Sequence, residues 1–175
     1  MTRRAPLAAL LLALLAGPGA AETRHLCWRG EGGYTMTGSF TFPDSLATAT
    51  FVGEGDVTAM SIEGFRDGAP LGSWTLDPAA PPRSWLLRYN AAEGRFYLGD
   101  TGDGLYQMWN ADGYVDDCGS PGFGFNAGNG GQDVCVDGVY QAESTIFWDT
   151  PLLSYAAPRD PLTCSNAPLL GKAPR

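Results

Sequence analysis

The sequence predicts an all-β fold: an antiparallel β-sandwich or jelly-roll-like single domain, stapled by disulfides and containing very little helix. Short segments with alternating polar and apolar residues follow one another along the chain. Turn-forming residues separate them at a spacing of roughly 8 to 12 residues, as in small sandwiches and barrels. The chain also holds 24 glycines and 13 prolines. Segments free of both, such as residues 83–93, show no sustained helical periodicity.

The clearest expected strand is the segment YTMTGSFTF, residues 34–42. Its tyrosine, methionine and phenylalanines fall on one side, and Thr35, Thr37, Ser39 and Thr41 fall on the other. Period two with threonine and aromatic residues is typical of a half-buried strand with one wet face. Further strands are expected, in chain order, at residues 47–52, 57–65, 71–76, 84–89, 95–99, 105–110, 134–140 and 144–148.

The N-terminal residues have the pattern of a secretory signal peptide. Arg3 and Arg4 precede an apolar run over residues 7–16 that is too short to span a bilayer. Cleavage is expected after Ala21, the second of two small residues at the usual spacing. The expected organisation is therefore a leader over residues 1–21, one β-rich domain over residues 22–164 and a frayed tail over residues 165–175. The protein is expected to be secreted or periplasmic.

The four cysteines remain after this cleavage, an even number in an oxidising compartment. Two disulfides are expected, and three pairings are open. The pairing we expect joins Cys118 to Cys135, the shortest closure, and Cys27 to Cys164, which ties the two ends of the domain together. Five prolines from Pro151 onward indicate that the last part of the chain is an extended strap.

The charge of the chain argues against nucleic-acid partners. Loss of Arg3 and Arg4 with the leader leaves nine basic against 19 acidic residues, a net charge of about −10. Such a surface repels nucleic acid and anionic membranes. No second long apolar run follows the leader, so no transmembrane segment is expected after cleavage.

Four short motifs carry a resemblance to a known kind of module. They are GSFTFPD (residues 38–44), GSWTLD (72–77), YQMWNADG (106–113) and GFGFNAGN (122–129). The mature chain resembles a module without an assigned activity that occurs in exported bacterial proteins, some of which carry a C-terminal sorting signal. This chain departs from the sorted members because no apolar segment with a basic tail follows Cys164. The resemblance implies a secreted β-rich domain and supplies no catalytic residues.

The stretch between Cys118 and Cys135 contains six glycines and the string GFGFNA, residues 122–127. A dinucleotide cradle needs this string between a strand and a helix N-terminus. No helix can follow through the glycines after it, so we interpret the stretch as an irregular glycine-rich loop closed by a disulfide. Phe123 and Phe125 either alternate inward as a short strand or point outward beside Trp109.

The residues needed for common catalytic machinery are sparse. His25 is the single histidine, which excludes histidine-rich metal sites. It is expected in a mobile terminus outside the strands, and this argues against a catalytic triad in which a histidine activates a serine or cysteine. A glycosidase needs two facing carboxylates. The glutamates offered for such a pair are Glu31, Glu54, Glu63, Glu93 and Glu143, but their spacing selects no pair.

Two further site hypotheses rest on clusters. Calcium binds in oxygen-rich turns. The candidate calcium ligands form an acidic cluster that consists of Asp100, Asp103, Asp112, Asp116 and Asp117. Their spacing fits no EF-hand loop. A ligand platform is expected at Trp109 with Gln107 and Asn110, because an aromatic flanked by amides suits sugars.

The function expected from these patterns is a non-enzymatic, secreted or periplasmic binding or structural module without a required cofactor. Its partner is expected to be a glycan or a cell-envelope component. The alternatives are a secreted polysaccharide hydrolase that uses paired carboxylates and a calcium-stabilised cell-envelope scaffold.

Overall fold

The alternating segment at residues 34–42 becomes the central strand of the largest sheet. The computed structural model describes residues 19–98, 106–112, 118–128 and 130–166. In it, β2 (Tyr34–Pro43) pairs with β1 (Ala21–Arg29) on one side and β4 (Ala59–Arg66) on the other. Two outer strands, β13 (Ser154–Tyr155) and β5 (Ala69–Thr75), complete sheet A in the order β13-β1-β2-β4-β5.

Two smaller antiparallel sheets pack against sheet A. Sheet C has the order β12-β11-β10-β9-β6, and sheet B has the order β3-β7-β8. Sheet C consists of β12 (Val139–Tyr140), β11 (Gly131–Val136), β10 (Phe123–Gly128), β9 (Gln107–Trp109) and β6 (Trp85–Leu86). Sheet B consists of β3 (Val52–Gly53), β7 (Arg88–Asn90) and β8 (Arg95–Phe96).

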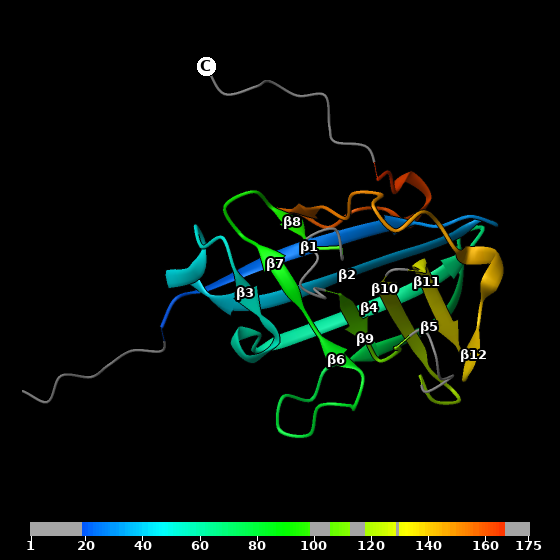
Figure 1. Ribbon diagram of the computed structural model, residues 1–175, viewed down its shortest axis with the longest axis horizontal. Helices are drawn as coiled ribbons and strands as arrows, with labels where there is room; N and C mark the ends of the chain where they lie inside the picture. Colours follow the sequence, from blue (N-terminus) through cyan, green and yellow to red (C-terminus); the bar gives the residue numbers. More distant parts are fainter. Residues whose placement is uncertain (1–18, 99–105, 113–117, 129, 167–175) are drawn as a thin grey trace, which may run out of the picture.

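The helical part of the described chain is limited to single 3-10 turns. These are η1 (Asp44–Leu46), η2 (Glu54–Asp56), η3 (Ala142–Ser144) and η4 (Pro161–Thr163). Figure 1 shows the strands of sheets B and C crossing in front of those of sheet A. The predicted all-β, sandwich-like fold with very little helix is therefore confirmed.

Aromatic side chains fill the space between the layers. Phe40 of β2 contacts Tyr89 of β7 with ring centroids 4.9 Å apart. Trp28 of β1 lies 5.3 Å from Phe125 of β10, which in turn lies 4.9 Å from Trp109. All five rings are fully buried. Rings at these distances add contact energy beyond their area, so this cluster joins the three sheets.

Glycine allows two features of this packing. Asp67 and Gly68 both have positive φ and form the two-residue turn between β4 and β5, as an Asp-Gly hairpin requires. In β4, a Cβ on Gly64 would lie 1.9 Å from the ring of Phe123. The missing side chain of Gly64 therefore provides the space in which sheet C docks on sheet A.

Several strand predictions were wrong. Residues 47–52 contribute only Val52 to a strand, and residues 144–148 contribute a single bridge at Ile146. Strands β1 and β13 were not expected, and β10 is the short inward-facing strand that was one of the two alternatives for Phe123 and Phe125. The stretch between Cys118 and Cys135 is not an irregular loop, because β10 and β11 pair within it as a hairpin. Phe123 and Phe125 both point inward and are fully buried.

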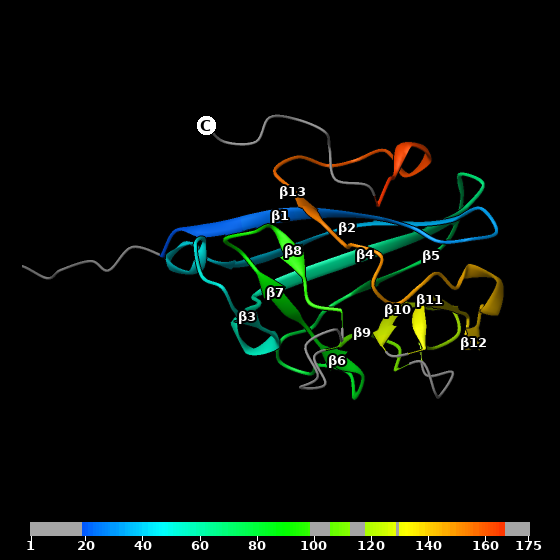
Figure 2. The ribbon, with the colours of Figure 1, turned by 45° about the horizontal axis from the view of Figure 1, so that its top comes forward.

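The C-terminal strap, residues 151–166, lies across the outer side of sheet A. Its β13 pairs with β1, and after η4 Cys164 forms a disulfide with Cys27 of β1. Figure 2 shows this segment returning along β1. The second disulfide joins Cys118 to Cys135 at the edge of the β10–β11 hairpin. Both disulfides have the expected partners.

The tail was expected to fray from residue 165, and its first two residues, Ser165 and Asn166, are described and make hydrogen bonds. The side-chain amide of Asn166 donates to the Arg29 carbonyl at 2.7 Å, and its oxygen accepts from the Arg29 backbone N–H at 3.0 Å. The carbonyl of Ser165 accepts a hydrogen bond from the Tyr155 hydroxyl. Residues 167–175 of the expected tail, and residues 1–18 of the expected leader, lie outside the described residues.

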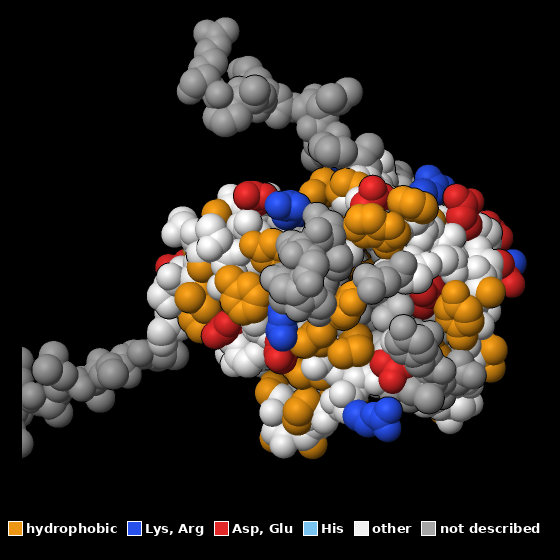
Figure 3. Space-filling view, in the orientation of Figure 1, with side chains coloured by type: hydrophobic (Ala, Val, Ile, Leu, Met, Phe, Trp, Pro, Cys, Tyr) orange, Lys and Arg blue, Asp and Glu red, His pale blue; other side chains and the backbone are white. Residues whose placement is uncertain are grey.

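Within the described residues, no helix has the length and apolarity that a membrane span needs. On the face shown in Figure 3, apolar side chains occur in several separate groups, with acidic and basic side chains between them. This mixed surface agrees with ordinary surface composition and singles out no docking patch there.

Candidate functional site: a hydroxyl-lined hollow on sheet A

The register of sheet A aligns polar side chains in rows across its outer face. Residues directly opposite in antiparallel strands point to the same side of the sheet. His25, Ser39, Ser61 and Thr75 are directly opposite one another on β1, β2, β4 and β5, and form the first row. The first row therefore crosses four strands.

A second row lies next to the first. Thr37, Glu63 and Ser73 are directly opposite one another on β2, β4 and β5. The β1 position of this row is Cys27, which carries the disulfide to Cys164. The strap therefore ends the second row at β1, while its β5 end stays exposed.

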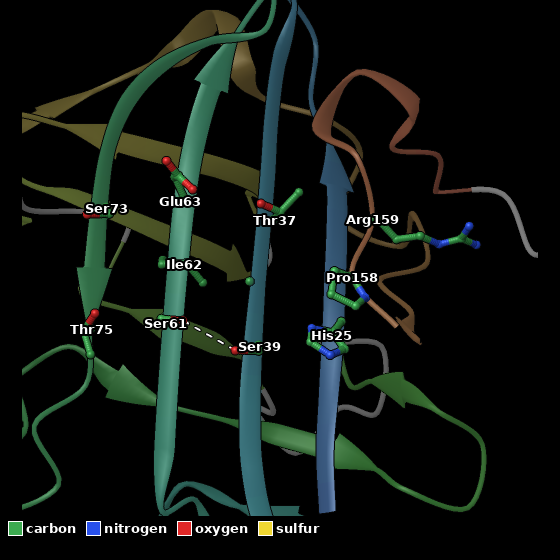
Figure 4. A pocket seen from close by; sticks show the side chains of 11 residues that line it. His25, Thr37, Ser39, Ser61, Ile62, Glu63, Ser73, Thr75, Pro158 and Arg159 are labelled. Carbon is green, nitrogen blue, oxygen red and sulfur yellow. Dashed lines mark hydrogen bonds between the residues drawn. The ribbon is translucent and has the colours of Figure 1, made fainter. Parts of the chain in front are cut away.

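The two rows line a hollow of about 430 Å³. Pro158 and Arg159 of the strap contribute to its wall. Figure 4 shows His25 beside Pro158 at the β1 end and the hydroxyl side chains spread over the other three strands. The Arg159 side chain extends away from the rows, and its guanidinium lies 4.2 Å from the centre of the Tyr155 ring. The hollow is consequently an open, shallow and polar surface.

Most polar side chains in this hollow have free hydrogen-bonding capacity. Ser39 and Ser61 share one hydrogen bond of 3.5 Å. The side chains of Thr37, Glu63, Ser73 and Thr75 make no hydrogen bond or ion pair with other described residues. Each hydroxyl can donate one hydrogen bond and accept two, and the carboxylate can accept several. The surface can thus bind a ligand that both donates and accepts hydrogen bonds.

The predicted platform at Trp109, Gln107 and Asn110 is wrong because two of its members are fully buried. Trp109 belongs to the aromatic core. Gln107 pairs with backbone, since its amide donates to the carbonyls of Arg88 and Tyr97 and its oxygen accepts from the Arg88 N–H. Asn110 is partly exposed, and its amide donates to two backbone carbonyls near the second disulfide. These polar groups stabilise the fold instead of facing a ligand.

The five glutamates offered for hydrolysis lie on different elements. Glu54, Glu93 and Glu143 pair with Arg88, Arg95 and Arg66, respectively. Glu31 lines a different hollow from Glu63. None of the three hollows lined by Ser61, by Leu98 and by Phe147 is lined by two of these glutamates. In these three hollows of the described part of the chain, no two glutamates face each other as hydrolysis of a glycosidic bond requires.

Of the predicted calcium ligands, only Asp112 lies within the described residues; Asp100, Asp103, Asp116 and Asp117 lie outside them. The Asp112 carboxylate is 3.9 Å from the Arg83 guanidinium. In the part of the chain that is described, histidine, cysteine, aspartate and glutamate form no group of three that could hold a metal ion. The calcium hypothesis therefore finds no support from Asp112 and stays a prediction for the other four residues.

One carboxyl group outside the hollow has an altered acidity. Asp133 of β11 is opposite Asn126 of β10, on the side of sheet C that points away from Phe125 and Val134. It is only 6% exposed, and burial raises the pKa of its carboxyl from 3.8 to about 6. A hydrogen bond of 3.4 Å from the Asn126 amide opposes this increase. Asp133 lines none of the hollows described here.

A second hollow, of about 530 Å³, contains an exposed aromatic residue. Phe147 lines it and is 67% exposed, and Arg29 and Glu31 contribute charges of both signs. The ring of Trp148 lies 6.1 Å from that of Phe147. This hollow provides a control site for experiments on the hollow of sheet A.

Sequence reasoning did not find the hollow as a site. It identified Thr37 and Ser39 as a wet strand face, but it did not join them to Ser61, Ser73 and Thr75. The register that joins Ser61 to Thr75 depends on the Asp67-Gly68 hairpin together with an irregularity between Gly64 and Phe65, which shifts the pairing of β4 and β5 by one residue. His25 was expected outside the strands and lies instead within β1, because residues 21–29 pair along their whole length with β2. The two strands form a hairpin, but the β1 sequence has no polar–apolar alternation that would reveal it.

Comparisons with protein-family models, with curated proteins and with solved structures find no match for this chain.

Proposed function

We propose that the protein is an exported, non-enzymatic binding module that acts outside the cytoplasm, in a periplasm or beyond the cell, and binds its ligand in the hollow of sheet A. The observation that carries this proposal is the set of unpartnered polar side chains in the two rows. Four hydroxyl or carboxylate side chains, those of Thr37, Glu63, Ser73 and Thr75, gather here in one hollow beside the Ser39–Ser61 pair and have no partner among the described residues, so their hydrogen-bonding capacity is available to a ligand.

The disulfides and the leader-like N-terminus support the location. Paired cysteines persist in oxidising compartments, and both pairs of this chain are at bonding distance. One of them anchors the strap that forms part of the wall of the hollow. An exported binding surface of this kind gains rigidity from a staple that is stable in its compartment.

The positions of the carboxylates favour binding over hydrolysis. Glu63 is the one carboxylate among the described residues that line the hollow. Acid-base cleavage of a glycosidic bond uses two carboxyl groups on opposite sides of the bond. A single carboxylate beside hydroxyls is suited to holding a polar ligand without cleaving it.

The experiment is a thermal-shift screen of the secreted, oxidised protein. The panel contains neutral saccharides, amino acids, nucleotides and polyamines, each added well above its expected Kd. A ligand at ten times its Kd adds about 1.4 kcal/mol to the free energy of unfolding. For a domain of this size this raises Tm by about 3 to 6 °C.

Two variants locate the binding. Ser61→Tyr places a large neutral side chain in the middle of the first row, and we expect it to abolish the shift. Val139→Tyr places the same side chain at an exposed position of β12, in another sheet, and should keep the shift. The proposal fails if no compound stabilises the wild-type protein, or if Ser61→Tyr keeps the full shift.

A further inference from the structure

The spacing of the two rows restricts the shape of the ligand. Neighbouring strands of a sheet lie about 4.8 Å apart, and outward-facing residues along one strand lie about 7 Å apart. The first row therefore offers one polar side chain every 4.8 Å or so across β1, β2, β4 and β5. This repeat is close to the advance of one sugar ring in an extended, β-linked glycan chain.

The charges in the hollow restrict the ligand further. Glu63 contributes a negative charge, and the guanidinium of Arg159 is directed away over Tyr155. The whole chain carries a formal net charge of −8. An anionic polymer would meet this carboxylate, while the guanidinium of the lining residue Arg159 is directed away from the rows and does not offset it. The hollow is therefore suited to a neutral ligand.

From the repeat, the hydroxyls and the charge together, we propose that the ligand is an unbranched, neutral, β-linked glycan that lies across the strands of sheet A, with about one sugar on each of four strands. This inference rests on the proposed function. The hydroxyls of Ser39, Ser61, Thr75 and their neighbours in the second row exchange hydrogen bonds with the sugar hydroxyls.

Glu63 has a defined role in this arrangement. It lies in the second row between Thr37 and Ser73, on one of the two inner strands that the glycan crosses. Its carboxylate has two acceptor oxygens and can accept hydrogen bonds from two adjacent hydroxyls of one sugar. Glu63 is exposed and has no ion-pair partner among the described residues, so its replacement should leave the fold intact.

The strap limits the length of chain that can bind. At β1, Cys27 is bonded to Cys164, and Pro158 lies beside His25. At the opposite edge, Ser73 and Thr75 of β5 are exposed. A glycan can extend past β5 into solvent, where it gains no contacts, but it meets the strap at β1. The affinity should therefore stop rising once four sugars are bound.

The test is isothermal titration of the oxidised full chain with neutral β-1,4-linked gluco-, manno- and xylo-oligosaccharides of one to about six sugars. In at least one series we expect the affinity to rise with each sugar up to about four and then to stay constant, following the strand spacing. Malto-oligosaccharides, whose α-linked chains coil, should bind at least tenfold more weakly. Raising the salt from about 50 to 500 mM should leave the affinity unchanged, because the ligand is neutral.

Matched variants assign the contacts. Glu63→Gln removes the charge and one acceptor, and should weaken binding of the tetramer about tenfold, in keeping with the loss of one charge-assisted hydrogen bond. Phe147→Ala changes the second hollow and should leave the affinity unchanged.

The outcomes separate this inference from the proposed function. If the oligosaccharides do not bind but a polyamine does, in a salt-dependent way that Ser61→Tyr abolishes, the hollow is a binding site and the glycan inference is overturned. A wild-type dimer that Ser61→Tyr converts to a monomer would assign the face to a second copy of the chain. Affinity that does not depend on length, or that Phe147→Ala removes, would also overturn the inference.

Discussion

Replacement of Asp133 by asparagine is expected to stabilise the protein at neutral pH. Burial raises the pKa of this carboxyl from 3.8 to about 6, a change of roughly two units. Each unit corresponds to about 1.4 kcal/mol, so ionisation of Asp133 costs the folded state about 3 kcal/mol. Asparagine has nearly the same shape and carries no charge at any of these pH values.

The sign of the pH dependence follows from linkage. The folded protein keeps the proton on Asp133 up to about pH 6, whereas the unfolded chain releases it near pH 3.8. The contribution of Asp133 to stability is therefore fully present below 3.8, decreases as the pH rises, and is lost above about 6. Asp133→Asn avoids this loss, so its advantage over the wild-type protein should be near zero at about pH 4 and about 3 kcal/mol at about pH 7.5.

Urea unfolding of the oxidised protein measures this difference. With an m value of about 2 kcal/mol per molar urea, the midpoint of Asp133→Asn should exceed that of the wild-type protein by about 1.5 M at pH 7.5. Asp149→Asn, which removes the same charge from an exposed position, serves as the control. A midpoint shift of equal size at both pH values, or a less stable variant at pH 7.5, would refute the reasoning.

Two further predictions concern the disulfides and the core. Serine at Cys27 and Cys164 should lower the free energy of unfolding by about 5 kcal/mol and weaken ligand binding, because the bond closes a separation of 137 residues and anchors the strap. Serine at Cys118 and Cys135 should lower the free energy of unfolding by about 3 kcal/mol and leave ligand binding intact. If the two double variants weaken ligand binding equally, the strap has no special role in the hollow. Trp109→Ala should cost about 3 to 5 kcal/mol in chemical unfolding. Trp109→Phe should cost clearly less, since the Trp109 indole N–H has no hydrogen-bond partner among the described residues. A harmless Trp109→Ala would show that the ring is not packed as described.

Local sequence patterns predicted the parts of the fold that depend on local chemistry. Strand β2 was predicted because its alternation is complete, and β4 and β5 were predicted as two short strands, at residues 57–65 and 71–76, on either side of a turn. Strand β1 was missed, and β10 was only one of two alternatives, for physical reasons. The outer side of β1, which is exposed or covered by the strap, carries Thr23, His25 and Cys27, so the strand shows no regular alternation of polar and apolar residues. Strand β10 is rich in glycine, which has a low strand propensity.

The candidate site was harder to predict than the fold. Trp109 between two amides resembled a platform because sequence shows which side chains are adjacent in the chain but not which side of the sheet is covered. Conversely, Ser61 and Glu63 have no distinctive neighbours in sequence, and their importance depends on register with β2 and β5. The two polar rows take one or two residues from each of four strands, so they can be recognised only when the pairing of the strands is known.

The bond between Cys27 and Cys164 also sets the order in which the hollow can be completed. Cys27 precedes Cys164 by 137 residues, and β13, the outer neighbour of β1, lies late in the same interval. Sheet A therefore lacks its last strand, and the hollow lacks its wall, until residues 154–164 have been made and placed beside β1. A chain that is cut short before residue 154 would contain both polar rows but no strap beside them, so the complete hollow forms only in molecules that include the strap.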